Sequence, residues 1–485
     1  MTIRAISKGA GLALAASTGM ALAETPPGFE LRTSVEAFES QDSTIQGLHA
    51  ITVLWDFGNH LYAGQSFYSA ALGDAGGAFF WGFEAGTRVP LSDRVSLSFQ
   101  GFLGGGGGAG EVPGDGLMTR LYAGGSYKVA EQFALDLGVS HVRILGSPVD
   151  TLSYGLGVTY RPGGWDETGP LSGSNVVDRL SAVRPSVRSF IVDDGRRARN
   201  GSPQEDVTLA GAEIAFALNP ASELFVNADG AVAGDGEGYM NVLGGYRLFA
   251  DLGAVRPYVD ASIGFGGGGD IDTGAGLLLS AGVGAAVEIS PSFEIMAGVQ
   301  RVQATDGDFG AWSPYLRGSV NLGGPRSRDG ADGRTWRLAY STAITHQFAN
   351  DDFRKSGDAR DASPTLNATA IDVYLADNLY FTGEAQTVMY GDAGGYALGI
   401  LGAGYRFDVA DRWDLSVEAL IGAAGGGGVA TNGGLIAGAR AEVDYALTDN
   451  FLLSGGVGYL QTLEGGGMAP VTVHAGIKIP FQLGG

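Results

Sequence analysis

The sequence predicts an all-β protein of about 24 antiparallel strands in three homologous repeats of about eight strands each. Three observations carry this prediction. Four sequence landmarks occur three times in the same order along the 485 residues. Within each copy, apolar side chains recur at every second position, which is the period of a strand with one apolar face. The 83 glycines leave few segments that could form a long helix, because each interior glycine destabilises a helix.

The internal repeat is defined by motifs rather than by composition. A Gly-Asp-x-x-Gly motif places its aspartate at Asp74, Asp235 and Asp392. A run of glycines follows each copy, at residues 104–108, 266–269 and 425–428, and a Gly-Leu pair follows each run. Turns ending at Phe133, Phe293 and Phe451 complete the series. Each repeat is larger than a solenoid unit, so it is expected to be a small domain or one third of a large closed one.

The predicted strands have the length and the connections of membrane-spanning strands. Apolar residues alternate with small or polar residues across residues 121–129, 133–140 and 413–421. Strands of about ten residues can cross a bilayer when they are tilted. Short turns alternate with longer, glycine-rich loops. Aromatic residues begin the strands beside the short turns, where an interfacial girdle would lie: Phe133, Phe293, Trp413 and Phe451.

The first 23 residues have the form of a secretory signal peptide. Arg4 and Lys8 precede an apolar run that ends at Ala21-Leu22-Ala23, and we expect cleavage after Ala23. An N-terminal anchor helix is the alternative, but the run is short and ends in small residues. The chain has no cysteine, so export would require no disulfide formation.

These features together resemble the outer-membrane β-barrel proteins of Gram-negative-type envelopes. The resemblance covers the whole mature chain by pattern and implies an even strand number, periplasmic turns, external loops, outer-membrane lipid around the barrel and insertion by the outer-membrane assembly machinery. One departure is the C-terminus, where Phe481 is followed by four more residues instead of ending the chain. A secreted array of soluble β-domains is less compatible, because its solvated strand faces should be rich in Lys, Glu and Thr.

Twenty-four strands could form one large closed barrel or three eight-stranded barrels, and we favour three tandem barrels. A single ring would enclose a very wide lumen that no segment could plug, and its lining would need more charge. The many small inward residues argue the other way, unless a narrow channel or cavity remains in each barrel. The predicted organisation is a signal peptide (1–23), repeat 1 (24–162), a linker (163–184), repeat 2 (185–322), a linker (323–334) and repeat 3 (335–485).

The sequence indicates no enzyme, cofactor or metal site. The five histidines, His49, His60, His141, His346 and His474, do not recur at corresponding positions of the repeats, and a hydrolytic triad needs such a base beside its nucleophile. The formal net charge of -22 disfavours nucleic acid as a partner.

Acidic residues on the strand face opposite the apolar one are the candidate functional residues: Asp136, Asp229, Glu288, Glu294, Glu384 and Glu418. Rings of carboxylates can line a cation-preferring path. They can also form interior hydrogen-bonded networks that only hold each barrel together. The first interpretation predicts a porin-like passage of small solutes with a weak cation preference, and the second a non-conducting structural or surface-display protein.

Overall fold

The computed structural model describes residues 28–40, 42–56, 60–112, 114–161, 180–322, 336–358, 360, 362–448 and 451–483. The expected signal peptide (1–23) and second linker (323–334) lie outside these residues, as does most of the first linker. No helix in the described part of the chain is long and apolar enough to cross a membrane.

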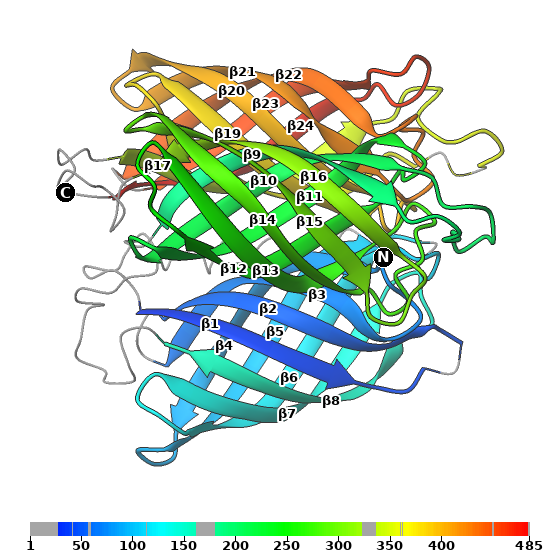
Figure 1. Ribbon diagram of the computed structural model, residues 1–485. Helices are drawn as coiled ribbons and strands as arrows, with labels where there is room; N and C mark the ends of the chain where they lie inside the picture. Colours follow the sequence, from blue (N-terminus) through cyan, green and yellow to red (C-terminus); the bar gives the residue numbers. More distant parts are fainter. Residues whose placement is uncertain are drawn as a thin grey trace.

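Three successive sets of strands make up the regular structure (Figure 1). The first set is Gly28–Ala37 (β1), Ile45–Asp56 (β2), Leu61–Gly73 (β3), Phe79–Pro90 (β4), Val95–Gly107 (β5), Leu117–Lys128 (β6), Phe133–Ile144 (β7) and Asp150–Tyr160 (β8). The second is Leu180–Val192 (β9), Val207–Asn219 (β10), Ser222–Gly234 (β11), Met240–Phe249 (β12), Val255–Gly267 (β13), Leu277–Ser290 (β14), Phe293–Ala304 (β15) and Gly310–Asn321 (β16). The third is Trp336–Phe348 (β17), Thr365–Tyr374 (β18), Leu379–Tyr390 (β19), Ala397–Ala410 (β20), Trp413–Gly425 (β21), Leu435–Thr448 (β22), Phe451–Thr462 (β23) and Val471–Leu483 (β24).

Each set closes on itself into an antiparallel barrel, which we call barrels 1, 2 and 3. Consecutive strands pair with each other, and the rings close where β1 meets β8, β9 meets β16 and β17 meets β24. The closing ladder of barrel 3 runs from Trp336 opposite Leu483 to Phe348 opposite Val471. The prediction of three eight-stranded barrels is confirmed, and the described strands form no single large ring. Barrel 2 begins at Leu180, inside the span expected to be linker.

The period-two pattern sorts the side chains of each strand between the inside and the outside of its barrel. In β7, Phe133, Leu135 and Leu137 are exposed on the outer surface, whereas Ala134 and Asp136 are buried inside. The outer surface of a barrel is therefore apolar, as lipid contact requires.

Glycines inside the barrels leave room for aromatic rings. A Cβ built at Gly284 would lie 2.5 Å from the ring of Tyr258, and one at Gly298 would lie 2.5 Å from the Tyr315 hydroxyl. Tyr380 covers Gly404 in barrel 3 in the same way. The small inward residues therefore do not leave the barrels underfilled, because large side chains from neighbouring strands occupy the space above them.

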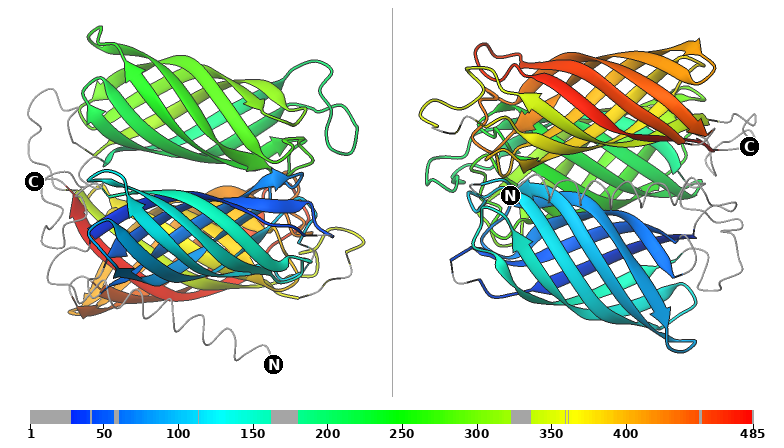
Figure 2. Two further views of the ribbon diagram at one scale, coloured as in Figure 1. Left: turned by 90° about the horizontal axis from the view of Figure 1, so that it is seen from below. Right: turned by 180° about the vertical axis from the view of Figure 1, so that it is seen from behind.

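The barrels lie side by side with their axes roughly parallel, at the corners of a triangle (Figures 1 and 2). The longer loops of all three gather at one end, on the right in Figure 1, and the short turns lie at the other. We call these the loop end and the turn end.

The repeated glycine motifs join the barrels at the loop end. In each case a glycine of the Gly-Asp-x-x-Gly motif packs on the glycine run of the next barrel: Gly77 on Gly267 and Gly268, Gly238 on Gly425 and Gly426, and Gly395 on Gly107 and Gly108. We call these three contacts the glycine contacts. The motif glycines have φ of 95°, 86° and 88°, which side chains rarely adopt, and a Cβ there would meet the neighbouring backbone. The motif of barrel 1 contacts barrel 2, the motif of barrel 2 contacts barrel 3, and the motif of barrel 3 contacts barrel 1. The three barrels therefore form a closed ring with approximate threefold symmetry, like the subunits of a cyclic trimer.

The expected aromatic girdle at the turn end is present in part. Phe133, Phe293 and Trp413 are partly exposed at the starts of their strands, as an interfacial position requires. Phe451 is buried instead, so the equivalent position in the third repeat contributes nothing to an outer belt.

Candidate functional site

The interior of barrel 2 is closed by a layer of buried ion pairs. Glu213 lies 2.7 Å from Arg184, 2.8 Å from Arg247 and 3.3 Å from Arg317, from three different strands. Arg184 and Arg247 also contact Glu223, at 2.9 and 2.6 Å. All these side chains are 0% exposed. A water-filled path through this layer would leave some of them accessible, so the layer seals the barrel.

A second part of the same barrel carries further buried charges. Arg188 lies 3.1 Å from Asp229, and Arg247 lies 3.2 Å from Asp260, with 0% exposure at each side chain. Gln300 donates to Asp260 at 2.9 Å and accepts from Arg188 at 3.2 Å, which joins strands on opposite sides of the ring. The buried network pairs four guanidinium groups with four carboxylates, so it is formally neutral.

Barrel 1 has a similar interior. Arg120 donates from Nε to Glu36 at 2.7 Å and from Nη1 to Glu84 at 3.4 Å. Arg32 donates to Gln100 at 2.6 Å, and its Nη2 lies 3.1 Å from Glu30. Strands β1, β4, β5 and β6 are thereby connected across the lumen.

Barrel 3 differs because carboxylates outnumber its cations. Arg440 donates to Glu384 at 2.6 Å and to Glu418 at 2.7 Å. Lys478 contacts Glu442 and lies 3.4 Å from Asp372 and 3.2 Å from Asp444. The buried or nearly buried charges of this barrel are thus five carboxylates against one guanidinium and one ammonium group, with His474 on Glu442 at 2.8 Å.

Five of the six acidic residues predicted as inward-facing are buried inside the barrels: Asp136, Asp229, Glu294, Glu384 and Glu418. Only Glu384 and Glu418 share a partner, Arg440. Asp229 belongs to the buried network of barrel 2, and Glu294 contacts Arg256 near the turn end. Glu288 is exposed at the end of β14, opposite Glu294 in register. The predicted residues therefore form no continuous ring of carboxylates.

The buried arginines are the residues that the sequence analysis missed. Arg184, Arg188, Arg247 and Arg317 are among the largest fully buried side chains. The alternation in β9 could have indicated that these arginines face inward. Arg184 and Arg188 lie an even number of positions apart and therefore share one face of the strand. The opposite face carries the exposed Val187 and Ile191. Charged residues on the inner face of a small barrel are expected to pair with each other, because the lumen is too narrow to hydrate them.

No site for metal or catalysis stands out. The described residues contain no group of three or more His, Asp or Glu side chains that could hold a metal ion. His141 pairs with Asp150 on the outside of barrel 1, while His474 lies inside barrel 3. The expectation that the chain is not an enzyme stays a prediction.

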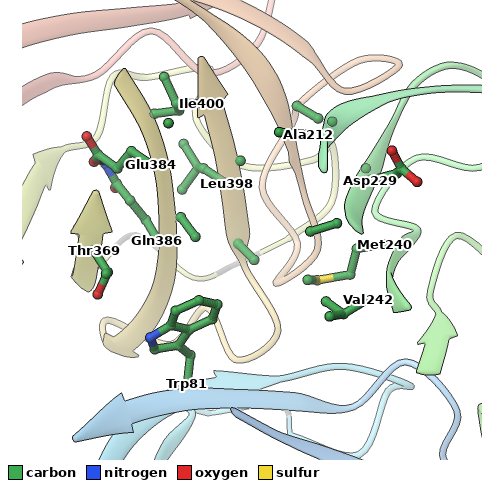
Figure 3. Close-up of a pocket in the computed structure, with 18 of the residues that line it drawn as sticks. Trp81, Ala212, Asp229, Met240, Val242, Thr369, Glu384, Gln386, Leu398 and Ile400 are labelled. Atoms are coloured by element: carbon green, nitrogen blue, oxygen red, sulfur yellow. Dashed lines mark hydrogen bonds between the residues drawn. The ribbon is translucent and has the colours of Figure 1, made fainter. Parts of the chain in front are cut away.

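A cavity of about 2460 Å³ lies between the three barrels. We call it the central cavity. Its wall is made mostly of outward-facing apolar residues, including Phe67 and Trp81 of barrel 1, Met240 and Val242 of barrel 2, and Phe381 and Leu401 of barrel 3. In the close-up, Trp81 and Met240 point into the space between the barrels, while the Asp229 carboxylate points away from it (Figure 3).

Charged groups at the loop end of the central cavity have partners. Arg199 lies 3.4 Å from Asp74, and Glu237 lies 3.0 Å from Lys355. Arg360 donates to Asp358, and these hydrogen bonds lower the pKa of the Asp358 carboxyl to about 2. Among the residues that the structure describes, pairing leaves no cluster of free charge where the cavity reaches the loops.

Neither a family model nor a curated protein sequence matches the chain. Among solved structures, Neisserial surface protein A (NspA) is similar at 17% identity over 30% of this chain and 99% of its own, with a TM-score of 0.23. A de novo designed transmembrane β-barrel is similar at 12% identity over 30% and 95%, with a TM-score of 0.21. OccK11 (OpdR) of Pseudomonas aeruginosa is similar at 11% identity over 94% and 95%, with a TM-score of 0.23.

The chain resembles Gram-negative outer-membrane β-barrel proteins in structure. At these identities the likeness concerns the fold alone.

Proposed function

We propose that this protein is an integral outer-membrane protein whose three barrels do not conduct, and that it serves as a structural or surface-display component of the membrane. The observation that carries the proposal is the buried ion-pair layer in barrel 2, where every charged side chain is 0% exposed. The interiors of barrels 1 and 3 are filled in the same manner, with only slight exposure of their charges. Interiors of eight-stranded barrels are just wide enough for side chains to fill.

The membrane location has its own test. The apolar outer faces of the strands predict that the protein fractionates with outer membranes and that its gel mobility changes on heating. Release by high salt or carbonate without detergent would contradict the location, because an integral barrel is extracted only when its apolar surface is transferred to detergent.

The absence of conduction is tested with purified protein in planar lipid bilayers. We expect no discrete conductance steps at protein loads at which a porin gives them readily. Reproducible steps would contradict the proposal.

A porin-like, weakly cation-preferring passage of small solutes is the second candidate, and the excess of carboxylates in barrel 3 favours it. If steps occur, neutralising Glu384 and Glu418 together (Glu384→Gln with Glu418→Gln) should weaken the cation preference. The matched control is Glu36→Gln with Glu84→Gln, since Arg120 holds that pair in barrel 1 as Arg440 holds the first pair. If both double variants changed the cation preference equally, the carboxylates of barrel 3 would not be the source of that preference.

A further inference from the structure

The central cavity is a void that the protein itself does not fill. Protein interiors are close-packed and contain few spaces larger than one water molecule. A space of about 2460 Å³ among three rigid barrels is therefore expected to contain other molecules. Its wall leaves large apolar side chains exposed towards it, with Phe381 48%, Ile421 51% and Leu224 46% exposed.

The cavity lies mostly at the depth of the strands and reaches the loops at one end. Its wall extends from the glycine contacts at the loop end to Phe293, Val320 and Phe481 near the turn end. The turn end of barrels 2 and 3 is itself joined by an apolar cluster that includes Leu322, Trp336 and Leu338. The cavity is thus bordered by the glycine contacts at the loop end and, between barrels 2 and 3, by this cluster at the turn end.

Three polar side chains on the cavity wall form a chain of hydrogen bonds with each other. Trp81 Nε1 donates to the Gln65 side-chain oxygen at 3.1 Å, and the Gln65 amide donates to Thr369 at 2.8 Å. Gln65 and Trp81 belong to barrel 1 and Thr369 to barrel 3, so this chain of hydrogen bonds also joins two barrels. With these groups satisfied and the loop-end charges paired, the wall offers an occupant mainly apolar surface.

We propose that the central cavity binds the acyl chains of membrane lipid, held between the three barrels as part of the native structure. Water gains little from a wall this apolar, because exposed Leu, Ile and Phe side chains offer it no hydrogen bonds. An acyl chain would bury the exposed apolar side chains of the wall, which is favourable. The proposal rests on the membrane location proposed above, but not on whether the barrels conduct.

Two glycines on the wall allow the cavity to be filled without disturbing the fold. A Cβ at Gly399 would have no neighbour within 4 Å, and one at Gly383 would meet only Leu401, at 3.8 Å. Both line the cavity. Gly125 is the matched control, because it lies in a strand with open space around its Cβ, where the nearest atom is 3.8 Å away, but outside the lining of the cavity.

The test is lipid retention. Protein is purified in detergent from phosphatidylethanolamine and phosphatidylglycerol vesicles, washed extensively, and its retained phospholipid is measured per chain. We expect lipid to stay bound to the unchanged chain, at least a two-fold loss in the double variant Gly383→Leu with Gly399→Leu, and no loss in Gly125→Leu. A heat-dependent gel shift verifies that each variant is folded. No retained lipid in a protein that fractionates with membranes, or equal retention in all three proteins, would overturn the proposal without affecting the membrane location.

A second measurement detects water in the cavity. The chain contains no cysteine, so a single cysteine introduced at Ala228, on the cavity wall, reports on that position alone. A charged, membrane-impermeant thiol reagent should leave Ala228→Cys unmodified in vesicles while it modifies Ser92→Cys in an exposed turn. Rapid modification of Ala228→Cys would show an aqueous path and overturn the lipid proposal.

Discussion

Arg120 and Arg440 show how a buried charge is held in this molecule. Each guanidinium binds two carboxylates from other strands of its own barrel, so none of the three charged groups is left without a counter-charge. Charge-assisted hydrogen bonds of this kind are directional and strong. Removing one partner of such a pair is costly, because the other charge stays buried and loses its compensation.

Among the buried charges, Glu213 is the residue whose neutralisation we expect to lower the free energy of unfolding most. It contacts three arginines and is fully buried, so Glu213→Gln should lower the free energy of unfolding by about 3–5 kcal/mol. This change in the free energy of unfolding is measured by urea titration of the protein in lipid vesicles, with the heat-dependent gel shift as the readout of the folded fraction. The control is Glu288→Gln at the exposed end of β14, expected to stay within about 0.5 kcal/mol. Similar midpoints for the two variants would contradict a structural role for the buried layer.

At the scale of strands and loops, the glycine motifs act as contact surfaces between barrels. The sequence pattern places these motifs in longer, glycine-rich loops and does not indicate that they contact another barrel. Their positions on three equivalent contacts explain why the same landmarks recur in all repeats. Each motif loop must both turn at its own strand end and approach the next barrel closely, and glycine permits both.

Gly77→Ala tests the contact between barrels 1 and 2. The added methyl group would clash with the backbone at Gly267 and Gly268, so we expect barrel 1 to shift from barrel 2. Spin labels at Ser92→Cys and Asp251→Cys, in short turns of the two barrels, should show a broader distance distribution in the variant. The control is Gly357→Ala, where φ is 86° but no atom lies within 4 Å of the Cβ, so only local strain is added. An unchanged distribution in Gly77→Ala would mean that the glycine contact does not position the barrels.

At the scale of the whole molecule, three homologous barrels form a ring from a single chain. The approximate threefold symmetry predicts that corresponding turns are equally spaced. Label pairs chosen from Ser92→Cys, Asp251→Cys and Asp411→Cys should therefore give three narrow distance distributions with similar maxima. Broad or clearly unequal distributions would indicate barrels that are tethered in sequence but not packed in a ring.

The sequence by itself determined the strands, the three repeats and the apolar character of the outer surface of each barrel. The alternation of apolar and small residues is a local property, visible in any ten residues of β7 or β21. The repeat indicates eight strands per copy, but it does not by itself decide between three closed barrels and one. Inward-facing Asp136, Asp229 and Glu384 could be predicted for the same reason, since their position in the alternation fixes the face on which they lie.

Only the tertiary structure decided what these residues meet. The partners of Glu213 come from β9, β12 and β16, and the glycine run of one repeat contacts the motif of another. Such contacts join residues far apart in sequence, and their geometry follows from barrel closure and barrel packing rather than from local pattern. The central cavity exists for the same reason, because three barrels packed side by side leave a space that no single repeat contains.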